Sequence, residues 1–250
     1  MHYSTEAIVL KNIPYGEADL IVTYLTKNYG LLNLFAKSPR KIKSRFGSSL
    51  EPLTYSQISF IGKEDNLQKI IQSDIIHPFQ AIRENYRLFL QIANAVRFLI
   101  QALPKKEPNS ELFYLLLNTL LYLEKRIKPD NYILFLKVRG LSILGYLPDF
   151  KNCGVCRQEL KEEFYYSSGF IICKKCSSSY HYSSSVLPIP ISQGVIKLLK
   201  EISTWTLNFL ERVKISDKLF NEMEKFLQNH IFTVLGYNKT WDTEKNITAS

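Results

Sequence analysis

The four cysteines of this chain form two Cys-x-x-Cys pairs, and this spacing constrains the fold more than any other feature. Cys153 and Cys156 make the first pair, Cys173 and Cys176 make the second, and sixteen residues separate them. Each pair aims two thiolates at one point, and together they supply the four soft ligands of a tetrahedral Zn²⁺ site. Apolar runs on both sides of Ser167-Ser168-Gly169 supply a connecting hairpin. The pattern predicts a zinc ribbon with one structural Zn²⁺ per chain, because four thiolates leave no open position for catalysis.

Two disulfides or four unrelated buried thiols are the alternatives. A chain of 250 residues can build a large core and gains little from disulfides. Its first residues lack the basic-then-apolar profile of a signal peptide, and the apolar stretch 112–123 is too short to span a bilayer. Zinc and a cytoplasmic location are therefore expected. His181 follows Cys176 by five residues and could replace a ligand, but four cysteines already suffice.

The first 78 residues predict a small β-barrel. Five segments rich in β-branched and aromatic residues alternate with turn signals such as Pro14-Tyr15-Gly16 and Asn28-Tyr29-Gly30. Five short strands at this spacing favour a barrel of the OB type, a class that commonly binds single-stranded nucleic acid. The expected strands cover residues 6–13, 20–25, 31–36, 53–61 and 66–73.

A basic segment interrupts this barrel. The formal net charge is +9, and residues 37–45 hold five cations with no acidic residue. A solvated loop that is basic by accident would usually contain some Asp or Glu, so we expect the segment to contact a polyanion. The candidate DNA-binding residues are Lys37, Arg40, Lys41, Lys43 and Arg45.

Aromatic side chains in the barrel are candidates for base stacking, although aromatics at strand positions more often belong to the core. The candidates are Tyr24, Tyr29, Phe35, Phe46, Tyr55 and Phe60.

After residue 78 the apolar period changes to that of helices. Helices are expected over about 79–103, 110–127, 129–144, 192–211 and 216–235. The expected fold is therefore α+β and multidomain: an N-terminal OB-type barrel, then a helical bundle with an inserted four-cysteine zinc ribbon. The expected domains are residues 1–78 for the barrel, 79–148 with 188–235 for the helices, 149–187 for the ribbon, and a disordered tail from 236 to 250.

No catalytic constellation is evident. The four histidines are scattered, and neither a Ser-His-Asp order nor a glycine-rich phosphate loop occurs. The sequence therefore predicts a protein that is not an enzyme.

Three sequence stretches carry a family resemblance. The first joins Ile8-Val9-Leu10 to Pro14-Tyr15-Gly16-Glu17, and the second runs from Ala36 to Arg45 and on to Leu50-Glu51-Pro52. The third runs from Arg139 through Leu144-Gly145-Tyr146-Leu147-Pro148 to Cys153. In this order, they resemble the RecO family of bacterial recombination mediators, over nearly the whole chain.

The resemblance implies a role in RecF-pathway repair. RecO-like proteins bind single- and double-stranded DNA, anneal complementary strands, and engage the C-terminal tail of single-stranded DNA-binding protein. Together with RecR they help load RecA onto coated strands. The resemblance also implies a cytoplasmic, nucleoid-associated location without membrane contact. A zinc-ribbon and OB module of transcription or RNA metabolism remains the alternative, since such modules serve there too.

The helical region offers a site for the acidic partner tail. Residues 78–151 hold eleven Lys and Arg against six acidic residues. Cations beside apolar helix faces can rim a groove for an acidic peptide, although each can equally be a surface cation that packs its stem on apolar neighbours. The candidates are Arg126, Lys137 and Arg139, of which Arg139 lies where the family's helix-to-ribbon junction is usually basic.

Overall fold

The computed structural model describes residues 1–41, 44–63, 66–125, 130–180 and 187–236. The chain forms two compact units. The first contains residues 1–145 with 206–212, and the second contains residues 146–205 with those from 213 onward. The domain limits expected from the sequence stay a prediction, and the expected tail from 237 lies outside the described residues.

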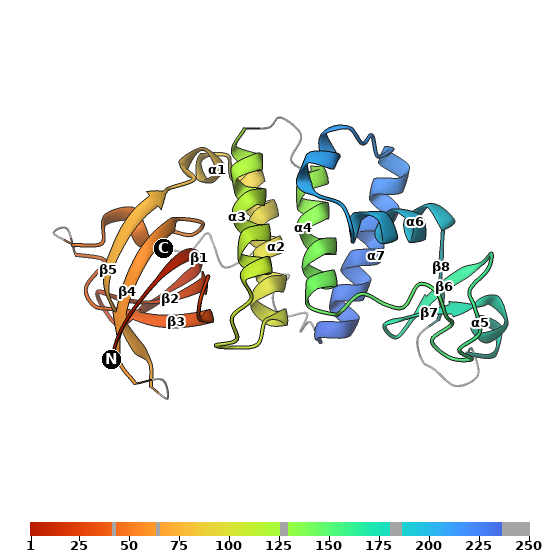
Figure 1. Ribbon diagram of the computed structural model, residues 1–250, viewed down its shortest axis with the longest axis horizontal. Helices are drawn as coiled ribbons and strands as arrows, with labels where there is room; N and C mark the ends of the chain where they lie inside the picture. The colour runs from red at the N-terminus through yellow and green to blue at the C-terminus, as the bar shows by residue number, and fades with distance from the viewer. Residues whose placement is uncertain (42–43, 64–65, 126–129, 181–186, 237–250) are drawn as a thin grey trace. The chain divides into compact units, whose positions relative to one another are not determined.

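A closed five-stranded barrel begins the first unit (Figure 1). Its strand order is β1-β2-β3-β5-β4, with β4 pairing back onto β1 and the β3–β5 pair parallel. This arrangement is that of an OB-type barrel. The strands are β1 His2–Tyr15, β2 Asp19–Thr26, β3 Gly30–Ala36, β4 Tyr55–Ile61 and β5 Gln68–His77.

The barrel core follows the two-residue period of its strands. On β2 and β3, Val22, Tyr24 and Leu34 are fully buried in the barrel core, and Thr23, between the first two, instead donates a hydrogen bond of 2.8 Å to Asn33 on the neighbouring strand. Strand β1 runs two residues beyond its expected end, to Tyr15, and the chain then turns at Gly16 with φ of 62°. The left-handed conformation at this turn suits glycine.

Helices complete the first unit. They are α1 Gln80–Glu84, α2 Tyr86–Ala102, α3 Ser110–Glu124 and α4 Asp130–Ile143, with the 3₁₀ turns η1 Gly47–Leu50 and η2 Leu207–Glu211. The sequence predicted one helix over 79–103, but the structure divides it at Asn85. The Asn85 side chain accepts a hydrogen bond of 3.1 Å from the Leu88 N–H and caps α2. Asparagine favours this capping position over a helix interior, which explains the break.

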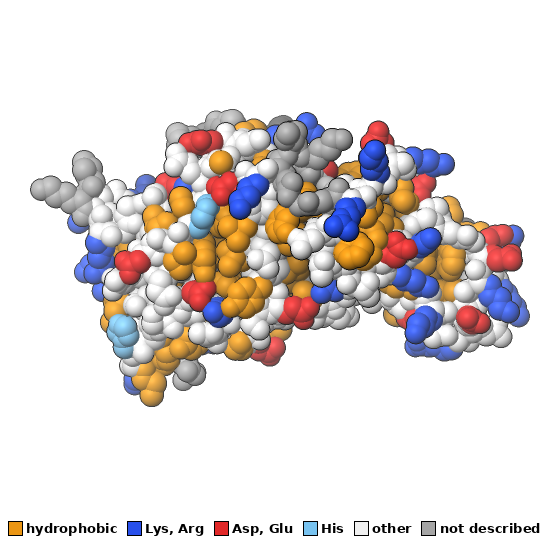
Figure 2. Space-filling model, turned by 45° about the horizontal axis from the view of Figure 1, so that its top comes forward, with side chains coloured by type: hydrophobic (Ala, Val, Ile, Leu, Met, Phe, Trp, Pro, Cys, Tyr) orange, Lys and Arg blue, Asp and Glu red, His pale blue; other side chains and the backbone are white. Residues whose placement is uncertain are grey.

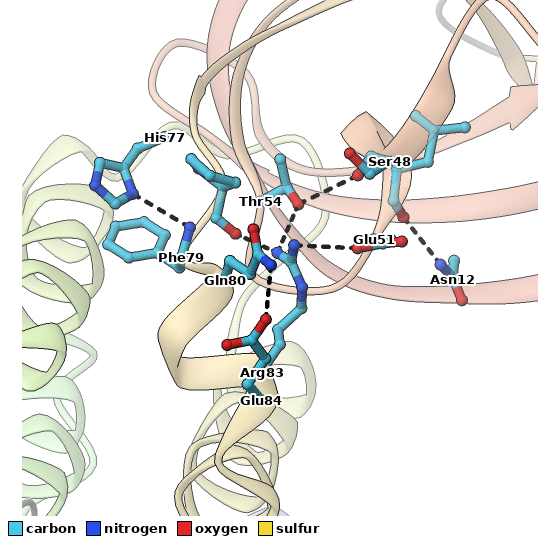
Figure 3. Close-up of polar contacts among 11 residues, drawn as sticks. Asn12, Ser48, Glu51, Thr54, His77, Phe79, Gln80, Arg83 and Glu84 are labelled. Carbon is cyan, nitrogen blue, oxygen red and sulfur yellow. Dashed lines mark hydrogen bonds and ion pairs between the residues drawn. The ribbon is translucent and has the colours of Figure 1, made fainter.

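Arg83 fixes the connection between β5 and α1 (Figure 3). Its guanidinium donates to Thr54 Oγ1 at 3.1 Å and to the Pro78 carbonyl, and it lies 3.1 Å from a Glu51 carboxylate oxygen. The Thr54 hydroxyl in turn donates to the Ser48 carbonyl at 3.5 Å. One largely buried cation therefore joins the β4 entry, the end of β5 and the first helix through charge-assisted hydrogen bonds.

In its described residues, the second unit contains three α-helices and a three-stranded sheet with the order β7-β6-β8. The elements are β6 Phe164–Ser167, β7 Phe170–Cys173, α5 Lys174–Tyr180, β8 Ile189–Ile191, α6 Gln193–Ile202 and α7 Asp217–Leu235. The predicted helix over 192–211 ends at Ile202. The Ser203 and Thr204 hydroxyls donate back to the carbonyls of Lys200 and Glu201, at 2.7 and 2.9 Å, and such local bonds compete with helix continuation.

The fold class expected from the sequence is confirmed: an N-terminal OB-type barrel precedes helices, and the four cysteines cluster beside a hairpin. Among the described residues, no helix combines the length and the apolar character needed to cross a bilayer.

Candidate metal centre and nucleic-acid interface

The β6–β7 hairpin brings the two cysteine pairs together. Phe164 pairs with Cys173 across the hairpin, and the turn at Ser168 and Gly169 has φ values of 49° and 90°. All four sulfur atoms lie within 4.8 Å of one another, and Cys156 and Cys173 Sγ are 3.9 Å apart. This cluster can hold a metal ion.

The first pair lies on a tight knuckle. The Cys153 N–H donates to the Gln158 carbonyl at 2.8 Å, and the Arg157 N–H donates to the Cys153 carbonyl at 2.9 Å. Position 154 has room only for glycine, because a Cβ there would lie 2.6 Å from the Phe170 Cβ. These contacts define the backbone turn that carries the two sulfurs.

The second pair lies on a different backbone conformation from the first. Cys173 ends β7 and Cys176 lies in the first turn of α5. A helical turn after the strand places residues three apart on one side, so the pair still converges. His181, the other candidate ligand, lies outside the described residues.

The sulfur arrangement fits zinc. Four Zn–S bonds of ~2.3 Å require sulfurs ~3.8 Å apart at the corners of a tetrahedron. The 3.9 Å between Cys156 and Cys173 Sγ agrees with that edge and is far longer than the ~2.05 Å of a disulfide. All four cysteines are free.

The electrostatics of the cluster also favour a cation. Burial alone would raise the pKa of the Cys153 thiol, but backbone N–H groups, first that of Cys156, outweigh it and lower the pKa to about 6. Burial, together with the neighbouring sulfurs, raises the pKa of Cys176 to about 12. A divalent cation at the centre of the cluster would offset this cost of ionising Cys176 beside the other sulfurs.

The basic segment leaves β3 at one end of the barrel. The Ser38 N–H donates to Asp19 Oδ1 at 2.6 Å, and the Arg40 N–H donates to the Ala18 carbonyl at 3.3 Å. These two bonds hold the segment on the β1–β2 hairpin. Figure 2 shows several Lys and Arg side chains at the barrel end of the molecule.

The candidate DNA-binding cations are solvent-exposed wherever the structure describes them: Lys37, Arg40, Lys41 and Arg45. Arg45 lies over the ring of Phe46, 4.8 Å from its centroid. Lys43 lies outside the described residues. Within the described part of the chain, none of the four exposed cations forms an ion pair, so their charges remain available to an anion.

The six aromatic residues considered for base stacking differ in their burial. Tyr24, Phe46 and Phe60 are at most 4% exposed and belong to the core, whereas Phe35 lies on the outer face. Tyr29 packs against the core, and Tyr55 donates to a Glu6 carboxylate oxygen. Burial therefore removes half of the candidates. The sequence had assigned Tyr15 to a turn and so missed an outward-facing ring.

The structure describes two of the three partner-tail candidates, Lys137 and Arg139. Arg126 lies outside the described residues. Lys137 and Arg139 are two positions apart on α4, a spacing that directs side chains to different helix faces. Arg139 forms an ion pair of 3.1 Å with Glu111 on α3.

The combination of an OB-type barrel with four sulfurs that could hold a metal ion is typical of nucleic-acid-binding proteins. Comparison with known proteins narrows this class. The family model "Recombination protein O N terminal" matches residues 1–79, and "Recombination protein O C terminal" matches residues 83–241. The chain belongs to the RecO family.

Curated relatives support the same family assignment. A DNA repair protein RecO of Thermodesulfovibrio yellowstonii is 99% identical over 250 residues, which cover 100% of both chains. The same name is carried by a Dehalococcoides mccartyi (strain CBDB1) protein, 30% identical over 93% of this chain and 90% of its own, and by a Syntrophus aciditrophicus protein, 30% identical over 94% and 91%. The family resemblance predicted from the sequence is confirmed.

Proposed function

We propose that this chain is a non-catalytic DNA-binding mediator of recombinational repair. It anneals complementary strands and helps to load RecA onto single-stranded DNA coated by single-stranded DNA-binding protein, in concert with RecR. The observation that carries the proposal is the set of exposed cations on the OB-type barrel of a RecO-family chain. Annealing brings two polyanions together, and cations that offset phosphate repulsion lower its barrier.

The proposal assigns the phosphate contacts to the basic segment. Replacing Lys37, Arg40, Lys41 and Arg45 by Ala should weaken binding to single strands of any sequence. It should also reduce the slope of log K against log salt by ~0.7 for each phosphate that is no longer neutralised. Fluorescence anisotropy across a salt series measures both quantities.

The matched control replaces four exposed lysines of the second unit, Lys200, Lys214, Lys218 and Lys225. This variant should keep the wild-type slope. A reversed outcome, with a reduced slope in the control and the wild-type slope in the barrel variant, would move the DNA surface to the second unit.

The proposed metal is one structural Zn²⁺ held by Cys153, Cys156, Cys173 and Cys176. The sulfur spacing and the cost of ionising four adjacent thiols support it. Zinc supplies folding energy to the ribbon and no chemistry, since the four sulfurs fill its coordination sphere.

The proposed partner tail is the acidic C-terminus of single-stranded DNA-binding protein, with Arg139 as its contact. Glu111 already neutralises Arg139, so the tail carboxylate would exchange with this carboxylate. Arg139→Glu should weaken binding of a labelled tail peptide by about tenfold or more. Glu111→Gln should keep or strengthen it, because it removes the competitor. Equal affinity of Arg139→Glu and wild type excludes Arg139 from the site.

A further inference from the structure

The four cysteines differ in how far solvent reaches their sulfurs. Cys153 is fully buried and Cys176 is 9% exposed, whereas Cys156 is exposed and Cys173 is partly exposed. The Cys153 Sγ is also engaged by the backbone, since it accepts a hydrogen bond of 3.3 Å from the Cys173 N–H. A small reagent in solution therefore meets the Cys156 sulfur first.

A second accessible sulfur lies beside Cys156. The Sγ atoms of Cys156 and Cys173 are 3.9 Å apart, although the two residues belong to different Cys-x-x-Cys pairs. A cysteine that has been oxidised to a sulfenic acid forms a disulfide when another thiol is close by. Cys173 meets this requirement better than Cys176, because Cys176 is buried.

We propose that Cys156 is an oxidation site, at which hydrogen peroxide joins Cys156 to Cys173 and thereby opens the metal centre. The Cys156 thiol attacks one peroxide oxygen, which gives a sulfenic acid and releases water. The Cys173 thiol then attacks the sulfenic sulfur, so that the S–S bond forms and a second water leaves. Two electrons pass from the sulfurs to the peroxide, and the two thiol protons leave in the waters.

The disulfide removes two of the four ligands, because a metal ion is bound by thiolates. The ribbon hairpin packs on α7 through Tyr166, whose ring centroid lies 5.3 Å from that of Phe226 and whose hydroxyl oxygen lies 3.1 Å from His230 Nδ1. Oxidation therefore destabilises the second unit, and reduction of the disulfide restores the ligands. This inference rests on the proposed zinc site and adds its response to oxidants.

The experiment treats the zinc-loaded full chain with hydrogen peroxide and follows zinc release with a metallochromic dye. The remaining thiols are then alkylated, and disulfides are mapped by mass spectrometry. We expect zinc release in step with formation of a Cys156–Cys173 disulfide. Addition of a thiol reductant and fresh zinc should restore the bound metal.

Two matched variants separate the reactive sulfur from the metal centre as a whole. Cys156→His keeps four ligands, since three cysteines and one histidine also bind zinc, but it removes the sulfur that peroxide attacks. It should release zinc about tenfold more slowly than wild type, because oxidation follows exposure. Cys176→His changes a buried ligand in the same way, and it should release zinc at the wild-type rate and form the same disulfide.

Three outcomes would overturn the oxidation site while leaving the metal centre intact. They are zinc retention by wild type in peroxide, equal release rates of the Cys156→His and Cys176→His variants, and a disulfide within either Cys-x-x-Cys pair. If a variant does not hold zinc, the disulfide map of the wild-type protein decides. Purified wild type without zinc would instead refute the proposed metal centre.

Discussion

The four-cysteine ribbon and the β-barrel bring their side chains together in different ways. The ribbon gathers four sulfurs from a segment of 24 residues, residues 153–176, through one hairpin and two short turns. The outer face of the barrel pairs Ile13, Ile21 and Phe35 from three strands, and a shift of one residue in their register would turn each side chain into the core. The ribbon therefore depends on residues close together in the chain, whereas the barrel depends on backbone pairing between distant ones.

Removal of one sulfur ligand should have the largest effect. Cys173→Ser should abolish zinc binding and unfold the ribbon, because metal-binding energy in such sites is folding energy of ~10 kcal/mol or more. Elemental analysis and limited proteolysis measure both results, with Ser179→Ala on α5 as the control. DNA binding through the barrel should survive, as the ribbon and barrel belong to different units. Wild-type protein without zinc and with its thiols oxidised in pairs would contradict the prediction.

A substitution that strains the backbone should destabilise the barrel, just as the loss of a cysteine should destabilise the ribbon. Gly30 starts β3 with φ of 63°, and a Cβ there would lie 2.1 Å from the Glu107 carbonyl oxygen. Gly30→Ala should therefore destabilise the first unit by ~2–4 kcal/mol, combining left-handed strain with a clash against backbone.

Gly16→Ala separates these two causes. Gly16 has φ of 62°, and no atom lies within 4 Å of the position that a Cβ would occupy, so only the strain of ~1–2 kcal/mol should remain. Urea unfolding of both variants measures the difference. Equal losses would show that the clash with Glu107 contributes nothing.

Acid should weaken the second unit before it weakens the barrel. His230 is fully buried, and its Nε2–H donates to the Tyr146 carbonyl at 2.7 Å while Nδ1 accepts from the Tyr166 hydroxyl, 3.1 Å away. Burial lowers the pKa of this imidazole below its ordinary 6.5. The unfolded chain thus binds more protons than the folded one, and stability falls as the pH drops below about 6.5.

His230→Leu should reduce stability at pH 8 by ~1–3 kcal/mol, since it leaves the Tyr146 carbonyl and the Tyr166 hydroxyl without their partner. It should also remove the His230 part of the pH dependence between pH 8 and 5.5. Zinc loss on acidification affects both proteins alike, so the difference between their unfolding curves isolates the histidine. Parallel curves would contradict this assignment.

The smallest effect is expected at the barrel ion pair. Hydrogen bonds from Lys27 and then Tyr55 hold the pKa of Glu6 below its ordinary value. Its contribution to stability is therefore present above about pH 4.5 and is lost as the pH falls further. Glu6→Gln should flatten the loss of stability below pH 4.5 and leave the region near pH 6 unchanged. An equal acid response of variant and wild type would remove Glu6 as its source.

Local features of the sequence predicted much of the fold. The cysteine spacing predicted the sulfur cluster, and turn signals predicted five barrel strands, because both depend on residues close together in the chain. The sequence did not show where capping side chains would interrupt a helix. The helix breaks at Asn85 and after Ile202 depend on single side chains that bond the backbone in place of the next helical turn.

The sequence by itself determined the cluster of four cysteines, the basic segment and the membership of the chain in its family, since each is carried by residue identity and spacing. Tertiary structure alone decided which aromatic rings reach solvent. Tyr24 and Phe35 both lie on strands, and only the barrel register buries the first fully and leaves the second partly exposed. It also decided that Arg139 meets Glu111, because packing of α3 against α4 joins residues far apart in the chain. Both outcomes depend on contacts between residues far apart in the chain, and a local sequence pattern does not specify such contacts.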